Sequence, residues 1–405
     1  MYTQLEPAFF KHNRTRTMEL LEGGVLVVSA HAAMQRNYDA AFKFEQEANF
    51  YYLTGIQRAD WWLLLDSSRD VSYLVSPEVD PVHALFDGRL TPRQAQEMSG
   101  ITAVISRAEA DEMLADLARS HQRVYTIDQP ARAGSFGFVL NPAARQLRQK
   151  LEDVFARVED ARPILAKLRA IKQSPEIAMI ETAIDMTIRT LEDVKSEFSH
   201  YQYEYQIEAD ITRGFRASGA AGHAYDPIVA SAANACTLHY VENNATLVNG
   251  SLVLLDVGAQ VSRYAADITR TYAYGELSPR QREVHAAVQA AHSDIIALLA
   301  PGLDVETYSQ KVDRRMQKAL LELGLISSLE DEKYRTYFPH AISHGLGLDV
   351  HDSLGAPDAF ATGMVLTVEP GIYIPEENIG VRIEDDILIT GEGHRNLSAR
   401  LSTML

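Results

Sequence analysis

Short apolar runs alternate with amphipathic stretches over the first 160 residues of the chain. Runs rich in β-branched and aromatic residues predict strands at 24–28, 61–65, 71–75 and 124–127. Helical periodicity predicts helices at 108–119 and 140–157. This alternation is typical of a self-contained α/β domain. No cluster of acids, bases or nucleophiles stands out within it, so we interpret it as a positioning or assembly domain.

A second domain is predicted to begin after residues 160–174. Ser174-Pro175-Glu176 places Ser at an N-cap, Pro at the first helical position and an acid in the first turn. Apolar residues then follow at helical spacing: Ile177, Ile180, Ile184, Ile188 and Leu191. We therefore predict an N-terminal domain over residues 1–165 and a second domain over 166–405.

The second domain contains an internal repeat. Ser278-Pro279 repeats the helix start and precedes a long helix that is expected to end at Pro301-Gly302. The pattern of Gly, five residues, an acid, one residue and Gly occurs at 250–258 and again at 363–371. Residues ~170–390 therefore consist of two similar halves, each running from helices into a β-hairpin. Such a duplication places the two acids of the pattern around a pseudo-two-fold axis.

Composition narrows the class of protein. Of 405 residues, 46% are hydrophobic and 23% are charged, as in ordinary soluble globular proteins. The formal charge of −17 repels phosphate backbones and anionic lipid, so no nucleic-acid or membrane partner is expected. The single Cys236 excludes an internal disulfide or a thiolate metal cluster. No apolar run reaches the ~18 residues of a membrane span, so we expect a cytoplasmic protein.

Two predicted hairpins carry acids in otherwise apolar strands. A turn centred on Val261-Ser262 places Asp256 opposite Asp267, with their Cβ atoms ~5 Å apart. The loop 375–378 likewise places Glu369 opposite Glu384. A single acid of this kind is commonly solvated at a strand end, and that interpretation stays open for each. Two desolvated pairs in a repeated pattern instead indicate a metal site, because facing carboxylates repel each other unless a cation neutralises them.

A histidine-rich segment, residues 338–352, lies between the hairpins. One imidazole added to four carboxylates suits Mn²⁺, Fe²⁺ or Co²⁺ better than structural Zn²⁺. Four acids also carry enough charge for two dications that share bridging carboxylates, and such a pair can hold a hydroxide nucleophile at neutral pH. Taken alone, a histidine of this segment is more often a hydrogen-bonded structural residue than a metal ligand.

These residues and phrases together resemble a known signature. The phrases are LLDVG, ADITRT, HGLGLDVHD, VEPGIY and RIEDD. They are similar, over residues ~165–395, to the five-ligand signature of the pita-bread metallopeptidases, in the proline-specific branch of Xaa-Pro aminopeptidases (aminopeptidase P) and Xaa-Pro dipeptidases (prolidase). Residues 234–240 resemble the substrate-site histidine region of that branch. Residues 42–55 are more similar to aminopeptidase P than to prolidase.

The resemblance implies a mixed α/β (α+β) fold, with a creatinase-like N-terminal domain followed by a pita-bread domain. It implies two divalent ions, with Mn²⁺ as first choice and Co²⁺, Fe²⁺ or Zn²⁺ as alternatives. The implied metal ligands are Asp256, Asp267, His344, Glu369 and Glu384, of which Asp267 and Glu384 bridge both ions.

The resemblance also implies residue roles in catalysis. Glu369 shuttles the proton of a bridging hydroxide that attacks the carbonyl before proline. His239, His340 and His351 line the pocket and contact the substrate. Arg382 orients the bridging ligand Glu384. Cys236 is expected to border the pocket without binding metal.

The implied function is release of the N-terminal residue from peptides with proline in second position. The alternative within the family is cleavage of Xaa-Pro dipeptides. A metal-free hydrolase of the creatinase type and a non-catalytic binding module share the fold, and the complete ligand set argues against both. The implied partners are Xaa-Pro peptides or dipeptides, and the family implies a homo-oligomer, either a dimer or a tetramer.

Overall fold

The computed structural model describes residues 5–130, 133–135 and 137–405. Contacts divide the chain into two compact units, residues 4–168 and 169–405, and helix α7 (Arg162–Ala170) spans the division. Within the described residues, no helix combines the length and the apolar character needed to cross a membrane.

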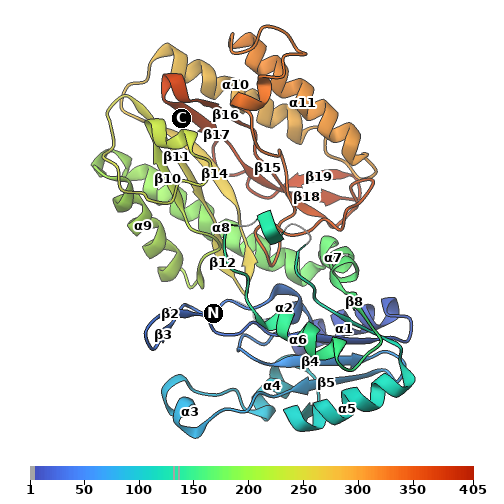
Figure 1. Ribbon diagram of the computed structural model, residues 1–405. Helices are drawn as coiled ribbons and strands as arrows, with labels where there is room; N and C mark the ends of the chain where they lie inside the picture. Colours follow the sequence, from blue (N-terminus) through green and yellow to red (C-terminus); the bar gives the residue numbers. More distant parts are fainter. Residues whose placement is uncertain (1–4, 131–132, 136) are drawn as a thin grey trace. The chain divides into compact units, whose positions relative to one another are not determined.

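The first unit is built around a six-stranded mixed sheet of order β6-β5-β4-β1-β7-β8 (Figure 1). Its strands are β1 (Val25–Ser29), β4 (Trp62–Asp66), β5 (Val71–Val75), β6 (Ala103–Ile105), β7 (Arg123–Thr126) and β8 (Arg157–Asp160), with a separate pair β2 (Gln35–Asn37) and β3 (Ala40–Ala41). Its helices are α1 (Pro7–Leu20), α2 (Ala48–Thr54), α3 (Pro81–Asp87), α4 (Pro92–Ser99), α5 (Arg107–Ser120) and α6 (Ala143–Glu152), with a 3₁₀ turn η1 (Ala133–Ser135).

Apolar packing on this sheet explains why these segments fold as predicted. Leu114 and Leu117 of α5 and Leu147 and Leu151 of α6 pack against alternate residues of the central strands. Strand β1 is buried along its whole length, as expected of a strand covered on both faces. The four predicted strands and two predicted helices are confirmed, although α6 is shorter at both ends than the predicted 140–157.

The second unit follows helices with strands twice. Its first half contains α8 (Ser174–Ser196), η2 (Phe198–His200), α9 (Glu204–Ala217), β9 (Gly222–His223), β10 (Ile228–Ser231), η3 (Ala232–Cys236), β11 (Ser251–Val257), β12 (Ala259–Val261), β13 (Tyr264–Ala265) and β14 (Ile268–Tyr274). Its second half contains α10 (Pro279–Ile296), α11 (Val305–Glu322), α12 (Tyr334–Tyr337), β15 (Val365–Val368), β16 (Gly371–Ile374), η4 (Pro375–Glu377), β17 (Ile379–Arg382), β18 (Asp385–Thr390) and β19 (Gly393–Asn396).

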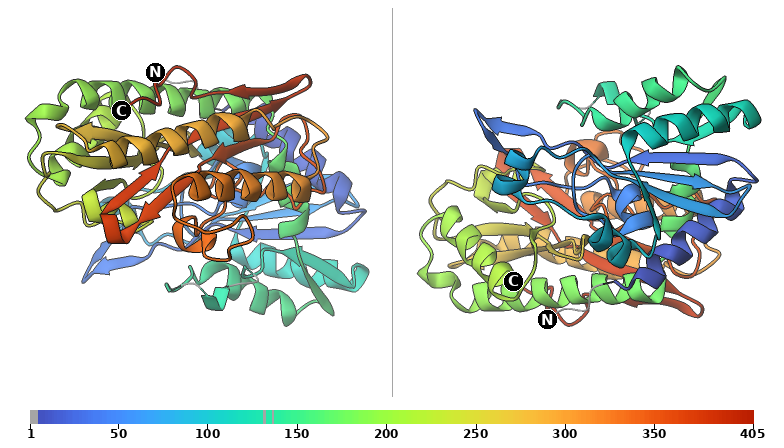
Figure 2. Two further views of the ribbon diagram at one scale, coloured as in Figure 1. Left: turned by 90° about the horizontal axis from the view of Figure 1, so that it is seen from above. Right: turned by 90° about the horizontal axis from the view of Figure 1, so that it is seen from below.

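The structure supports the repeat through matching local geometry. Gly250 and Gly363 precede β11 and β15 with φ of +85° and +93°, a conformation that glycine adopts without a steric penalty. Helices α10 and α11 lie side by side in Figures 1 and 2 and bury an apolar face against the second set of strands. These strands are therefore apolar on the helix side and free to carry polar residues on the other.

The two helix starts differ from each other. Ser278 caps α10 as predicted, since its side chain accepts a hydrogen bond from the backbone N–H of Gln281. The prediction for Ser174 is wrong, because Gln173 is the N-cap of α8 and Ser174 already lies inside the helix. Helix α10 also ends at Ile296, before the predicted end at Pro301-Gly302.

The predicted register of the first hairpin is also wrong. The tight turn at Ser262-Arg263 is present, with φ of +48° and +72°, but Asp256 pairs with Thr269 and not with Asp267. Asp267 lies two residues earlier, just before β14 begins. Because side chains alternate with a period of two, Asp267 and Thr269 share a face, so Asp256 and Asp267 are diagonal neighbours.

The second hairpin has the predicted pairing. Val368 pairs with Asp385 and Gly371 pairs with Arg382, so the two ladders keep one register and Glu369 and Glu384 fall at matching positions between them. Val381 and Ile383 belong to the core beneath α10 and α11. The alternate residues Arg382 and Glu384 therefore face the opposite side, where the candidate site lies.

Candidate metal centre

A cavity of about 270 Å³ in the second unit collects the predicted site residues. All nine side chains named from the sequence line it: Asp256, Asp267, Glu369, Glu384, His239, His340, His344, His351 and Arg382. Cys236 does not line this cavity, contrary to expectation, and its thiol instead contacts the backbone carbonyl of Ile379 at 3.4 Å.

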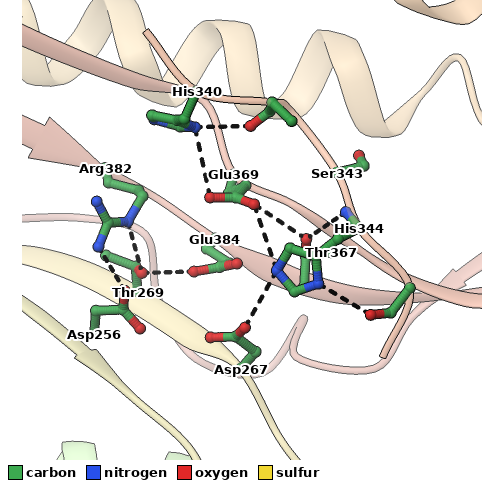
Figure 3. A network of polar contacts seen from close by, with 12 residues as sticks. Asp256, Asp267, Thr269, His340, Ser343, His344, Thr367, Glu369, Arg382 and Glu384 are labelled. Carbon is green, nitrogen blue, oxygen red and sulfur yellow. Dashed lines mark hydrogen bonds and ion pairs between the residues drawn. The ribbon is translucent and has the colours of Figure 1, made fainter. Parts of the chain in front are cut away.

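The carboxylates converge from both halves of the repeat (Figure 3). Ligand atoms of Asp267, His344 and Glu384 lie within 4.8 Å of one another, close enough to share one ion. His344 Nε2 lies 3.5 Å from Asp267 and 3.6 Å from Glu369, so Glu369 borders the same space. Oxygen donors with one imidazole nitrogen are the ligand set that Mn²⁺, Fe²⁺ and Co²⁺ accept.

The ring of His344 is oriented for metal binding. Its Nδ1 lies 3.0 Å from the backbone carbonyl of Gly345 and donates to it, which leaves the Nε2 lone pair directed at Asp267 and Glu369. Burial lowers the pKa of His344 to about 4. The imidazole is therefore neutral at pH 7, as a ligand must be.

Arg382 contacts a different acid from the one predicted. Its guanidinium donates to Asp256 at 2.5 Å, to the Tyr373 hydroxyl at 2.9 Å and to Thr269 Oγ1 at 3.2 Å. Glu384 accepts instead from Thr269 Oγ1, at 2.6 Å. Arg382 therefore holds Asp256 directly and reaches Glu384 only through the threonine.

The three pocket histidines differ in their freedom to contact a substrate. His340 Nδ1 lies 2.7 Å from the Ala341 carbonyl and its Nε2 lies 2.8 Å from the Tyr373 hydroxyl, so both ring nitrogens already have partners. His239 and His351 are exposed at the cavity. The His351 ring packs edge-on against His344, with 4.4 Å between centroids.

Tyr225 is a site residue that the sequence did not indicate. Its hydroxyl lies 2.6 Å from a carboxylate oxygen of Asp256 and 2.6 Å from one of Asp267. One hydroxyl proton cannot fully satisfy two anionic acceptors, so this pair of carboxylates still lacks a positive partner in the metal-free site. A single tyrosine in AYDPIV carries no sequence pattern that marks this role.

The pKa values show how poorly these charges are compensated without a cation. Burial, followed by the neighbouring acids, raises the pKa of Asp267 and of Glu384 well above the usual range. Burial and Asp256 raise the pKa of Glu369 to about 8, against the opposing effect of Arg382. Buried carboxylates of this kind require added positive charge, and the residues present therefore fit divalent metal ions.

We expect the metal-free protein to lose stability as the pH rises from about 4.5, the ordinary pKa of a glutamate, through about 8, the pKa of buried Glu369. Glu369, Asp267 and Glu384 bind protons more tightly in the folded than in the unfolded chain, so each rise in pH favours unfolding until these groups have ionised. Urea unfolding in the presence of a chelator measures this slope. The variant Glu369→Gln removes one titrating group and should flatten the slope, whereas an identical slope in the variant would contradict this origin.

Known proteins resemble this chain in both units. The family model described as "Metallopeptidase family M24" matches residues 178–391. The model described as "Aminopeptidase P, N-terminal domain" matches residues 10–125. A Xaa-Pro aminopeptidase of Haemophilus influenzae is 32% identical over 96% of this chain and 94% of its own length. The chain belongs to metallopeptidase family M24.

Solved structures of M24 relatives extend the likeness to the three-dimensional fold. Aminopeptidase P from E. coli with the inhibitor Pro-Leu is 29% identical, with a TM-score of 0.87 over 99% of this chain and 96% of its own. Proline aminopeptidase P II from Yersinia pestis is 31% identical, with a TM-score of 0.83 over 98% and 97%. The predicted fold, a creatinase-like N-terminal α/β domain followed by a pita-bread domain, is thereby confirmed, as is the predicted family.

Proposed function

We propose that this chain is a metal-dependent Xaa-Pro aminopeptidase, which releases the N-terminal residue of peptides with proline in second position. The observation that carries the proposal is the convergence of four carboxylates and one neutral imidazole on a single cavity. Relatives named Xaa-Pro aminopeptidase match nearly the whole chain, which supports the substrate class.

We assign two divalent ions to this cavity, with Mn²⁺ preferred because the donors are mostly hard oxygen atoms. Asp256 would bind one ion, His344 and Glu369 the other, and Asp267 and Glu384 would bridge them. Bound there, the ions would lower the pKa of a water molecule and polarise a peptide carbonyl.

The protein's own residues supply position and proton transfer. Glu369 borders the space between the ligands, where its carboxylate would accept the proton of the attacking water molecule. Arg382 and Thr269 fix the side chains of Asp256 and Glu384. His239 and His351, whose rings are exposed, would contact the substrate backbone.

The rest of the cavity suits a proline-containing peptide. Ile228, Leu238, Val241 and Val350 form an apolar part of the lining next to the polar centre. An Xaa-Pro bond is a tertiary amide without an N–H, so apolar contact with the ring can replace recognition of a donor.

A comparison of three substrates tests the proposal. The Mn²⁺-loaded protein should release free Xaa from an Xaa-Pro-Xaa tripeptide and act far more slowly on the matched Xaa-Ala-Xaa tripeptide. Chromatography of the products measures both rates, with chelator-treated protein as the control. Preference for the Xaa-Pro dipeptide would indicate a dipeptidase instead, and no release from either proline substrate would contradict the peptidase assignment.

The homo-oligomer that the family resemblance implies and the cytoplasmic location expected from the sequence also belong to this proposal. Light scattering of the purified protein tests for a dimer or tetramer. Cell fractionation tests the compartment.

A further inference from the structure

Glu204, the first residue of α9, is a fully buried carboxylate outside the metal centre. Its Oε1 accepts hydrogen bonds from the Ser231 backbone N–H at 2.8 Å, the Ser231 hydroxyl at 2.7 Å and the Asn234 amide at 3.1 Å. Its Oε2 accepts from the Tyr240 hydroxyl at 2.8 Å and the Ala245 backbone N–H at 2.9 Å. Five donors saturate the lone pairs of a single carboxylate.

All five donors belong to one segment, residues 231–245, which we call the pocket segment. It contributes Leu238, His239 and Val241 to the lining of the cavity. Residues 237–250, all of them described, form no helix or strand, and their strand-like backbone pairing is limited to an isolated bridge between Tyr203 and Thr246, just after the pocket segment. Side-chain contacts supply most of the rest: Asn243 hydrogen-bonds to the backbone of Val229 and Pro227, and Glu204 ties both ends of the pocket segment and Tyr240, directly beside His239.

We propose that Glu204 is a positioning residue, which sets the substrate-facing shape of the cavity by fixing the pocket segment. The inference rests on the proposed peptidase function for its kinetic consequence. Glu204 makes no hydrogen bond to any of the five proposed metal ligands, so its effect falls on substrate binding and not on metal binding.

The chemistry of the contact makes Glu204→Gln a specific test. A glutamine keeps the size but replaces one acceptor oxygen with an NH₂ donor. In either amide orientation this donor faces a backbone N–H, that of Ser231 or of Ala245, and a backbone N–H cannot reverse its direction. The variant therefore loses the contact at one end of the pocket segment whichever way the amide turns.

Two tyrosine variants provide a milder version of the Glu204→Gln test and its control. Tyr240→Phe removes a single hydrogen bond to Glu204 and preserves the ring, so it keeps the inference testable if Glu204→Gln does not fold. Tyr274→Phe removes a hydroxyl bond of 2.7 Å to the carbonyl of Tyr201, three residues before Glu204, and leaves every contact between Glu204 and the pocket segment intact.

Hydrogen exchange, steady-state kinetics and metal titration separate positioning from a general loss of stability. In Glu204→Gln we expect faster hydrogen exchange of amides 231–245, a KM for the Xaa-Pro-Xaa tripeptide raised about tenfold, a kcat within about threefold and Mn²⁺ affinity within about twofold of wild type. Tyr240→Phe should shift KM in the same direction by about two- to threefold. Tyr274→Phe should change neither KM nor the exchange of the pocket segment.

The outcomes distinguish this inference from the proposed function. Faster exchange with an unchanged KM, or a raised KM with an equal loss of Mn²⁺ affinity, would overturn the positioning role. If wild-type protein cleaves no Xaa-Pro peptide, the proposed function fails. Calorimetric binding of the tripeptide to wild type and variant then replaces KM, and equal affinity would overturn the inference.

Discussion

Replacing Asp267 with Asn is expected to lower kcat/KM by at least about 10³-fold and to abolish stabilisation by Mn²⁺. Metal ions contribute several kcal/mol to transition-state stabilisation, and about 4 kcal/mol corresponds to this factor. Asp267 shares its space with His344 and Glu384, so an amide there removes the anionic donor on which both ions are proposed to depend.

The same substitution should leave the metal-free protein at least as stable as wild type at pH 8. Burial and the neighbouring Asp256 raise the pKa of Asp267, which means that its ionised form is unfavourable in the metal-free fold. Asparagine removes that charge and keeps an oxygen that can accept from the Tyr225 hydroxyl. Thermal unfolding with and without Mn²⁺ measures both effects.

Asp226→Asn is the matched control for this substitution, because Asp226 also lines the cavity but is exposed. It should retain stabilisation by Mn²⁺. Metal-induced stabilisation that survives in Asp267→Asn would contradict the assignment of Asp267 as a ligand. If Asp267→Asn strongly destabilised the metal-free protein, the claim that ionised Asp267 is unfavourable in the metal-free fold would be contradicted.

The positions of the acids could be predicted from the sequence because they interrupt strands of Val, Ile and Leu. A carboxylate at such a position is costly enough to imply a compensating partner. Because the pattern of Gly, acid and Gly occurs twice, it indicated two such carboxylates in equivalent places. The face on which each acid lies depends only on the period of two along a strand. For this reason Asp256 and Asp267 share a site even though the predicted register was two residues off.

The contacts that hold the acids in place could not be predicted in the same way. Tyr225, Thr269 and Tyr373 reach the site as single polar residues, and a lone hydroxyl in a strand or a loop is compatible with many surroundings. The resemblance implied that Arg382, two residues before Glu384, orients that ligand. It contacts Asp256 instead, on β11 in the first half of the repeat, and local spacing carries no information on such a contact.

The sequence left Glu204 unmarked for a related reason. Its five donors are spread over 231–245, more than 25 residues further along the chain, and none of them forms a repeated pattern. Irregular segments are specified by side-chain contacts of this kind and not by periodicity, so the walls of a pocket are harder to predict than its metal ligands.

Arg382→Lys is expected to lower kcat/KM and Mn²⁺ affinity by about 10- to 100-fold, the effect typical of residues that orient metal ligands. The guanidinium binds Asp256, Thr269 and Tyr373 at once, and a lysine ammonium is a compact charge on a flexible stem that cannot reproduce this fork. Metal titration and steady-state kinetics measure the two losses.

Arg382→Met should destabilise the metal-free protein more than Arg382→Lys does, because it leaves the carboxylate of Asp256 without a cationic partner. Removing one partner of a buried pair costs about 3–5 kcal/mol, and bound Mn²⁺ should restore part of this stability by supplying positive charge. Arg280→Lys is the control, since Arg280 makes a similar two-pronged contact with Glu377 but on the surface, at 2.9 and 3.1 Å. Exposed pairs contribute about 0–1 kcal/mol, so this variant should behave as wild type. If Arg382→Lys matched Arg280→Lys in activity and in metal affinity, the buried guanidinium would be supplying charge alone, and its geometry would not matter to the centre.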